Sequence, residues 1–265
     1  MTVAHTEDRP TGFHCTFIVP CKGRLAFLRQ TIGSTVRQPH SHVIVVDYAC
    51  PDRCGDWIET HYPQCQVVRV HEETFNLARA RNLGAGAVKA GDGGWLCFLD
   101  ADVQLAPDFY ERMSGLAREA IFLVSRRGNP GLRGLLLVST ADFARSPGYD
   151  ERYTGYGREA SDLRLALFFS GLTYEFLPDG IVTHLPHENS LRTRFYTEKD
   201  LEASLWRNTA LLRETIAVWE RSTGVTAPPE LCHPIAIGRG WRSQLLRRIV
   251  PKTVGFWLRR RVTRA

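Results

Sequence analysis

Residues 95–102 read WLCFLDAD, an apolar run that ends in two carboxylates placed one residue apart, Asp100 and Asp102. Side chains two positions apart in a strand point the same way, so both carboxylates are expected to converge just beyond a strand end. Ligands of open α/β sheets bind at the carboxyl ends of strands. Two carboxylates there favour Mg²⁺ or Mn²⁺ held together with substrate phosphates, although such pairs also occur in solvated turns.

Short apolar runs alternate with helical patterns around this stretch. The strands expected in the first half of the chain are 16–19, 43–46, 66–70 and 95–99, and the helices between them are 24–36, 53–62 and 78–90. Near-continuous apolar runs are typical of parallel strands covered on both faces. The alternation therefore predicts βαβ units in a doubly wound α/β sheet.

The second half continues with mixed elements. We expect helices at 107–119, 159–169 and 198–221, and strands at 121–125, 135–138 and 181–184. The last helix is long and amphipathic. Residues 222–234 contain three prolines and one glycine, which indicates a linker.

The composition is that of a globular protein with a substantial core. The chain has 265 residues, 43% of them hydrophobic, which fits one large domain or one domain with an appendage. No run of 18 apolar residues occurs, and residues 1–12 lack the apolar stretch of a secretion signal, so we expect a cytoplasmic protein. The seven cysteines are expected to be reduced and buried. The spacing of Cys50 and Cys54 indicates zinc only weakly, since no second pair follows.

Positive charge is concentrated at the end of the sequence. Residues 239–265 contain nine of the 34 Lys and Arg residues and no acidic residue, so the remainder has 25 basic against 28 acidic residues. Aromatic and aliphatic residues such as Trp241 and Trp257 interleave with these basic ones, as in a helix that lies on an anionic membrane. A helix packed on the body with a solvated basic face is the alternative. A nucleic-acid partner is not expected, because the body lacks a recognised reading module.

Polar residues follow the first two expected strands. Lys22 and Arg24 could face phosphate groups, and Asp47 could face a base or a ribose hydroxyl, although each residue taken alone is more often a surface residue. Arg79 and Arg81 open a helix whose N-terminus would favour a diphosphate.

Two further stretches carry candidate site residues. GYDERYTGYGRE (148–159) combines glycines, aromatic rings and acids, which suits sugar recognition, although the same residues form ordinary turns. THLPH (183–187) places two histidines just after an expected strand, where one could be a third metal ligand.

Taken together, the sequence resembles the inverting glycosyltransferases of the GT-A fold, specifically family 2 and the related β-1,4-galactosyltransferase and chondroitin-polymerase type domains. The resemblance covers residues 15–187 and is carried, in chain order, by IVPCKGR (18–24), VVD (45–47), FNLARARNLG (75–84), FLDADV (98–103), GYDERYTGYGRE and THLPH. It implies a Rossmann-like, mostly parallel central sheet flanked by helices, here with a C-terminal helical appendage. It also implies a UDP-sugar donor, Mn²⁺ or Mg²⁺, and a hydroxyl-bearing glycan, lipid-linked or small-molecule acceptor.

The resemblance assigns roles residue by residue. Asp100 and Asp102 match the metal- and diphosphate-binding motif, and His184 matches a late metal-ligand histidine, with His187 as the alternative. The positions that match the donor-nucleotide site are Pro20, Lys22, Arg24, Asp47, Phe75, Arg81, Asp100 and Ala101. The positions implied for the sugar and the acceptor are Tyr156, Gly157, Arg158 and Glu159, with Tyr156 where the family commonly has a tryptophan.

The expected general base departs from the family pattern. Residues 157–162 read GREASD, so Ala160 occupies the position that is often the base, while Glu159 keeps the first acid. Glu159 is favoured because it lies at the junction of loop and helix, and Asp162, three residues on, is the alternative. Arg158 replaces a small residue. The loss of an acid at 160 leaves a second function open, a domain that binds a nucleotide sugar without transferring it.

These motifs define the expected organisation of the chain. Residues 1–222 are expected to form the glycosyltransferase domain, and 223–265 a linker and a basic amphipathic tail. Within the domain we expect a flexible N-terminus (1–12), a nucleotide-binding half (13–105), an acceptor-binding half (106–190) and a packing helix (191–222).

Overall fold

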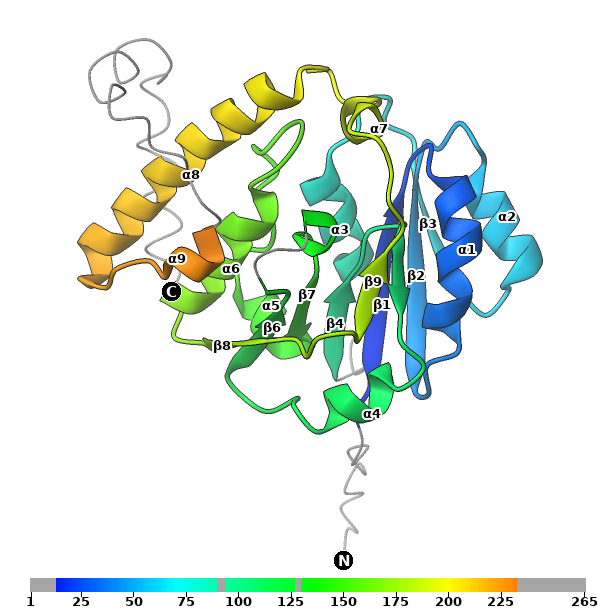
Figure 1. Ribbon diagram of the computed structural model, residues 1–265, viewed down its shortest axis with the longest axis horizontal. Coiled ribbons are helices and arrows are strands. Elements are labelled where there is room, and N and C mark those ends of the chain that lie inside the picture. Colours follow the sequence, from blue (N-terminus) through cyan, green and yellow to red (C-terminus); the bar gives the residue numbers. More distant parts are fainter. Residues whose placement is uncertain (1–12, 90–93, 127–129, 233–265) are drawn as a thin grey trace, which may run out of the picture.

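The computed structural model describes residues 13–89, 94–126 and 130–232, and its main feature is a seven-stranded sheet (Figure 1). The strands of the sheet run in the order β3-β2-β1-β4-β7-β6-β8. Their bounds are β1 Cys15–Cys21, β2 Ser41–Tyr48, β3 Gln66–Val70, β4 Trp95–Phe98, β6 Ile121–Val124, β7 Leu136–Ser139 and β8 Thr173–Phe176. β7 runs antiparallel to both of its neighbours, and the other neighbouring pairs are parallel. The predicted α/β fold with a mostly parallel sheet is confirmed.

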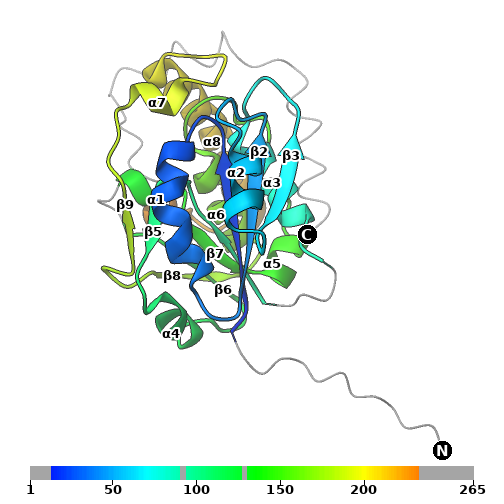
Figure 2. The same ribbon diagram turned by 90° about the vertical axis from the view of Figure 1, so that its right-hand side faces the viewer.

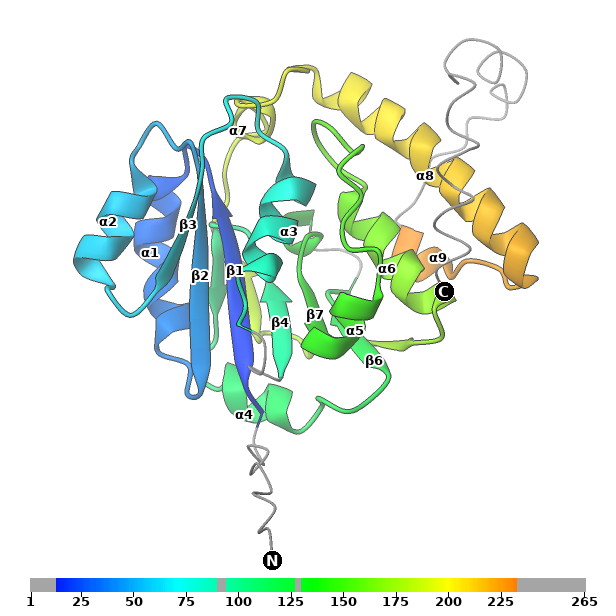
Figure 3. The same cartoon turned by 180° about the vertical axis from the view of Figure 1, so that it is seen from behind.

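Helices cover both faces of this sheet. Their bounds are α1 Leu25–Val36, α2 Cys54–His61, α3 Leu77–Gly86, α4 Phe109–Ser114, α5 Thr140–Arg145, α6 Glu159–Phe169, α7 Ser190–Thr193, α8 Leu201–Thr223 and α9 Pro229–Cys232. In Figure 2, α1 and α4 lie on one side of the sheet and α3 on the other. Figure 3 shows α3, α5 and α6 in front of it, with α8 crossing beside α6. None of the helices in these described ranges is long and apolar enough to cross a membrane.

Alternating side chains of the strands build two hydrophobic cores. Phe17 and Val19 of β1 belong to the core under α1, α2 and α4, whereas Ile18 belongs to the core under α3 and α6. This is the period-2 alternation of a strand buried on both faces. α3 comes very close to the sheet at Gly84, where a Cβ would lie 2.4 Å from a methyl carbon of Ile18, so the helix needs glycine there.

The parallel strands bring the motif residues to one edge. Lys22 follows β1, Asp47 lies near the end of β2, and Asp100 follows β4. In the register of β1 and β2, Cys21 is opposite Asp47, so the two strands end together. Because the carboxyl ends of parallel strands meet at one edge, the candidate site forms there.

A second, two-stranded sheet returns a late segment to the same edge. β5 (Val103–Leu105) pairs antiparallel with β9 (Val182–His184), and Val103 is opposite His184. The backbone N–H of Leu185 then donates to the carbonyl of Asp102 at 2.8 Å. This pairing carries residues 184–187 to the Asp-x-Asp motif.

Several expected boundaries shift in the structure. The helix expected at 107–119 is formed only by α4, and β5, β8 and α5 form where no element was expected. The residues after α8 pack on the body within the expected linker, since α9 packs on α6 and Leu231 is fully buried. This segment packs on the body because it buries apolar side chains. Ala227, Leu231 and Cys232 join the core under α6. The expected N-terminal segment 1–12 and the basic tail at 239–265 lie outside the described residues.

Candidate active site

A cleft of about 690 Å³ opens at the carboxyl ends of β1 and β4. Six residues expected at the donor site line it, namely Pro20, Lys22, Arg24, Phe75, Asp100 and Ala101, together with Asp102 and His187. Lys22 is nearly buried, and its ammonium donates to the carbonyl oxygens of Glu72 and Glu73 at 3.3 and 2.8 Å. Burial lowers the pKa of Lys22. The residues expected from the sequence thus bring two basic side chains, two carboxylates, a histidine and an aromatic ring to this cleft.

Asp102 and His187 contact each other inside this cleft, and both are residue types that bind metal ions in proteins. The Nε2 atom of His187 lies 2.8 Å from Oδ2 of Asp102, and both side chains are more than 90% buried. The Nδ1 atom of His187 lies 3.0 Å from the carbonyl oxygen of Glu188, to which it can only donate. Nδ1 thus faces the backbone of Glu188, and Nε2 is the ring nitrogen that faces Asp102. Burial, followed by the charge of Asp100, raises the pKa of Asp102.

This donor set fits a divalent cation. Two ligand atoms on an octahedral ion with bonds of about 2.1 Å stand about 3 Å apart, close to the separation of Nε2 and Oδ2. A neutral imidazole whose other nitrogen donates to a carbonyl is the usual form of a metal-bound histidine. Asp100 adds a half-buried carboxylate. Asp100, Asp102 and His187 could therefore hold Mn²⁺ or Mg²⁺.

His184 takes a different position from His187. It ends β9, and its ring lies against Gly131, where an added Cβ would be 2.0 Å from the ring. Gly131 lines the cleft, whereas His184 is not among the residues that line it. The structure therefore brings the alternative histidine, His187, to the carboxylates.

Arg81 connects the cleft to the candidate base. Its side chain has no exposed surface, and it donates from Nη2 to Oδ1 of Asp100 at 2.8 Å and from Nη1 to Oε1 of Glu159 at 3.0 Å. Its guanidinium also lies 5.1 Å from the ring centre of Tyr149. Gly134 provides the room, since a Cβ there would be 2.4 Å from Nη2. Arg81 thus contacts the two acids rather than the open cleft.

Glu159 lines a second cleft, of about 870 Å³, that adjoins the first. Asp100, Tyr156 and Arg192 are among the residues that line both clefts. Arg81 donates to the Oε1 atom of Glu159, and among the described residues the Oε2 atom has no hydrogen-bond partner. Asp162 is fully buried, accepts from the hydroxyl of Tyr153 at 3.2 Å and lines neither cleft. Of the two candidate bases, the structure exposes only Glu159 to a cleft.

The glycine-rich loop between the clefts is fixed by α8. Asn208, which is buried, donates to the carbonyl oxygens of Thr154, Tyr156 and Gly157 at 3.1, 3.3 and 2.8 Å. The backbone N–H of Tyr156 donates to the hydroxyl of Ser204 at 2.6 Å. The long helix therefore serves the site by supporting the loop that contains Tyr156.

The half-buried side chain of Arg158 is held by α8 and α9. Its φ of 80° is in the left-handed region that favours glycine. Its side chain donates to the hydroxyl of Thr209 at 2.9 Å and to the carbonyl of Cys232 at 3.1 Å. Residues of the second cleft include Gly157 and Arg158, as expected for the acceptor side.

Asp47 is not at either cleft. Its Oδ1 accepts from the backbone N–H of Cys50 at 2.9 Å, and its Oδ2 accepts from the N–H of Gly55 at 3.0 Å and from Arg69 at 3.2 Å. Its carboxylate binds the backbone at the start of α2, and its contact with a base or ribose stays a prediction. Arg79 also points elsewhere, in ion pairs with Glu72 and Glu151.

The late wall of the first cleft is formed by residues that were not expected from the sequence. Leu191, Arg192, Phe195 and Tyr196 all line it. The guanidinium of Arg192 donates to the hydroxyl of Tyr156 at 3.3 Å and lies over its ring. The one local signal was the run RTRFY at 192–196, where basic and aromatic residues alternate as they do in anion-binding clefts.

The sheet order, with a late antiparallel return to an acidic site at the strand ends, defines the GT-A fold of nucleotide-sugar glycosyltransferases. The chain belongs to glycosyl transferase family 2, whose model matches residues 16–155, more than half of the chain. A second model, the N-terminal domain of galactosyltransferase, matches residues 125–188. No curated protein matches this sequence.

Solved structures share this fold at low sequence identity. TarS 1–349 of S. aureus has a TM-score of 0.56 at 12% identity, covering 78% of this chain and 65% of its own. The mannosyltransferase PcManGT of Pyrobaculum calidifontis, crystallised with GDP-Man and Mn²⁺, has a TM-score of 0.57 at 18% identity, with coverages of 84% and 68%. GalNAc-T7 with UDP, GalNAc and Mn²⁺ has a TM-score of 0.57 at 14% identity, with coverages of 83% and 53%. The chain thus spans about two thirds or less of these structures.

Proposed function

We propose that this protein is a metal-dependent inverting glycosyltransferase. It moves a hexose or N-acetylhexosamine from a UDP-sugar to a hydroxyl group of a glycan, lipid-linked or small-molecule acceptor. The observation that carries the proposal is the pair of adjoining clefts, one with two carboxylates and a histidine and the other with Glu159, joined through buried Arg81. Family 2 membership supports sugar transfer, and the Mn²⁺ and nucleotide bound by PcManGT and GalNAc-T7 support the donor class.

The first cleft is assigned to the donor. Asp100, Asp102 and His187 would hold the ion, which supplies neutralisation of the negative charge on the leaving diphosphate. Lys22 and Arg24 place two further positive charges beside the same space. Arg24 lies 3.8 Å from Asp102, so it also limits the repulsion between the paired carboxylates and the diphosphate.

The second cleft is assigned to the acceptor. The acceptor oxygen attacks the anomeric carbon of the donor sugar. The bond between this carbon and the diphosphate oxygen breaks, and the configuration at the anomeric carbon inverts. Glu159 takes the hydroxyl proton on Oε2, the oxygen that Arg81 leaves open. Arg81 holds this carboxylate at a fixed position relative to Asp100. Tyr156, which lines both clefts, gives the sugar ring an aromatic wall.

The donor assignment is tested by calorimetric titration of UDP into metal-stripped protein with and without Mn²⁺. We expect binding that depends on Mn²⁺ and that Asp102→Ala and His187→Ala both abolish, because each removes a ligand atom. His184→Ala is the matched control, since its ring packs against Gly131, and it should retain binding. Mn²⁺-independent binding, or loss only in the His184 variant, would contradict the assignment. Titration with GDP in place of UDP shows whether the site discriminates between nucleobases.

The general base is tested by measuring the rate of sugar transfer by the Glu159→Gln variant with a bound donor. We expect normal UDP binding and a fall in kcat of about 10²–10⁴-fold, the usual contribution of a general base. Asp162→Asn is the comparison, because Asp162 lines neither cleft. This variant should have a lower free energy of unfolding and a nearly unchanged kcat. Transfer by Glu159→Gln at the wild-type rate would move the base elsewhere.

A further inference from the structure

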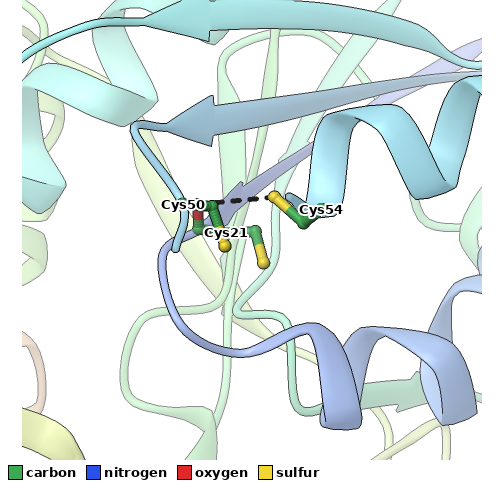
Figure 4. Close-up of side chains that lie close together, drawn as sticks. All are labelled: Cys21, Cys50 and Cys54. Atoms are coloured by element: carbon green, nitrogen blue, oxygen red, sulfur yellow. Dashed lines mark hydrogen bonds between the residues drawn. The ribbon is translucent and has the colours of Figure 1, made fainter. Parts of the chain in front are cut away.

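Three buried cysteines lie together outside both clefts. The sulfur atoms of Cys21, Cys50 and Cys54 all lie within 4.8 Å of one another. Figure 4 shows that they come from the end of β1, the loop after β2 and the first residue of α2. A dashed line there marks the thiol of Cys54 donating to the carbonyl of Cys21 at 3.8 Å. None of the three lines either cleft, so the proposed transfer reaction does not use them.

Asp47 fixes the two segments that carry Cys50 and Cys54. One carboxylate oxygen accepts from the N–H of Cys50, and the other accepts from the N–H of Gly55, the residue after Cys54. Cys21 is held opposite Asp47 by the parallel pairing of β1 and β2. Three separate segments are thus set in place around the sulfur atoms by one buried carboxylate and one strand pair.

The spacing of the sulfur atoms suits a thiolate-bound metal ion. Zinc–sulfur bonds of about 2.3 Å in a tetrahedral site put the sulfur atoms about 3.8 Å apart. The observed cluster, within 4.8 Å, reaches that spacing by side-chain adjustments of less than about 1 Å. No fourth Cys, His, Asp or Glu of the described ranges joins the cluster, which leaves one position for a water molecule.

We propose that Cys21, Cys50 and Cys54 bind one thiophilic divalent cation of the zinc class, as three thiolates. Each thiol releases one proton on binding, so the site with its ion carries one net negative charge. Groups that favour this charge are already present. The N–H of Gly23 donates to the sulfur of Cys50 at 3.1 Å, and Cys54 starts α2 at its positive end.

The ion would act on the turn that begins the donor cleft. Cys21 directly precedes Lys22, and the Gly23–Cys50 hydrogen bond ties the same turn to the cluster. Lys22 and Arg24 both line the cleft. An ion on Cys21 and Cys50 therefore fixes the turn that presents these two basic side chains. The cysteine site would have a structural role and is separate from the proposed Asp102–His187 site. Its thiolates are soft ligands, whereas the carboxylates of the other site are hard ligands.

The test is titration of the reduced, metal-stripped protein with Co²⁺, which gives an intense thiolate-to-cobalt charge-transfer absorbance only when sulfur is a ligand. We expect one Co²⁺ per chain by this signal, displaced by Zn²⁺ but not by Mn²⁺. Cys50→Ser and Cys54→Ser should lose most of the signal. Cys65→Ser, another buried cysteine, and Asp102→Asn should keep it.

Three outcomes overturn the proposal. They are absence of the absorbance in the wild-type protein, its survival in a Cys21, Cys50 and Cys54 triple serine variant, and its loss in Asp102→Asn. The wild-type titration decides even where a variant does not fold. Counting thiols in denatured, unreduced protein separates the remaining alternative. We expect all seven thiols of the wild type and all four of the triple serine variant to react. Five in the wild type with four in the variant would mean that a disulfide has formed within the cluster, which excludes the ion.

Discussion

Arg81 has no exposed surface, yet it carries a full charge between two acids on different sides of the site. A buried charge of this kind is tolerated only when it is paired and hydrogen-bonded. The planar fork of a guanidinium can reach Asp100 and Glu159 at once, which a single ammonium cannot. The sequence indicated a basic residue near a diphosphate at this position, and the structure shows that its contacts are the acids instead.

We predict that Arg81→Lys lowers kcat/KM by about 10²–10³-fold, because Glu159 loses the contact that orients it. The free energy of unfolding should fall by about 3–5 kcal/mol if the ammonium leaves one buried acid unpaired. Steady-state kinetics and urea denaturation measure the two effects. The matched control is Arg79→Lys on the same helix, whose partners Glu72 and Glu151 are partly exposed. Equal losses in both variants would contradict a special role for Arg81.

At the scale of elements, α8 and the loop before α6 form one unit. The sequence predicted the long helix but gave it no role beyond packing. In the structure one face of α8 donates side-chain hydrogen bonds to the loop carbonyls, through Asn208 and Arg207, while Ser204 accepts a loop N–H. Buried carbonyl groups need such partners, so the helix is required by the loop.

We predict that Asn208→Ala raises the KM for the acceptor while leaving UDP binding nearly unchanged, because it frees the loop and not the Asp-x-Asp motif. Loss of buried hydrogen bonds should lower the free energy of unfolding by about 1–3 kcal/mol. Acceptor kinetics and UDP calorimetry on the same preparation separate the two effects. Glu202→Ala on the exposed side of the same helix should change neither quantity. A loss of UDP binding in Asn208→Ala would mean that the loop belongs to the donor side.

For the whole molecule, the parts that could be predicted are those with a local signal. Six of the expected donor residues line the first cleft because strand ends of a parallel sheet meet at one edge. Asp47 also ends a strand, but no pattern reveals that its carboxylate satisfies the backbone of α2. β5 has three residues, too few for a period-2 pattern, so its pairing with β9 was not predictable. The position of His187 depends on that pairing.

The basic tail remains a prediction from the sequence at this scale. We predict that changing Arg259, Arg260 and Arg261 to glutamate weakens flotation with anionic vesicles by at least about 10²-fold, at about 1 kcal/mol for each basic residue. Transfer to a water-soluble acceptor should not change. Changing Arg53, Arg118 and Arg126 on the exposed surface of the body to glutamate alters the net charge by the same amount and is the control. Equal flotation of the tail variant and the wild type would reject the membrane surface as a partner.

The β5–β9 pairing has a consequence for how the protein folds. Asp102 and His187 lie in the two halves of the chain, and the chain between them must close into a loop before their side chains meet. Closing a loop of that length costs entropy that only late tertiary contacts repay. We therefore expect the Asp102–His187 contact to be among the last features to form, and neither half would contain it alone. An ion or nucleotide bound there stabilises the junction of the halves, so binding strength reports completed folding.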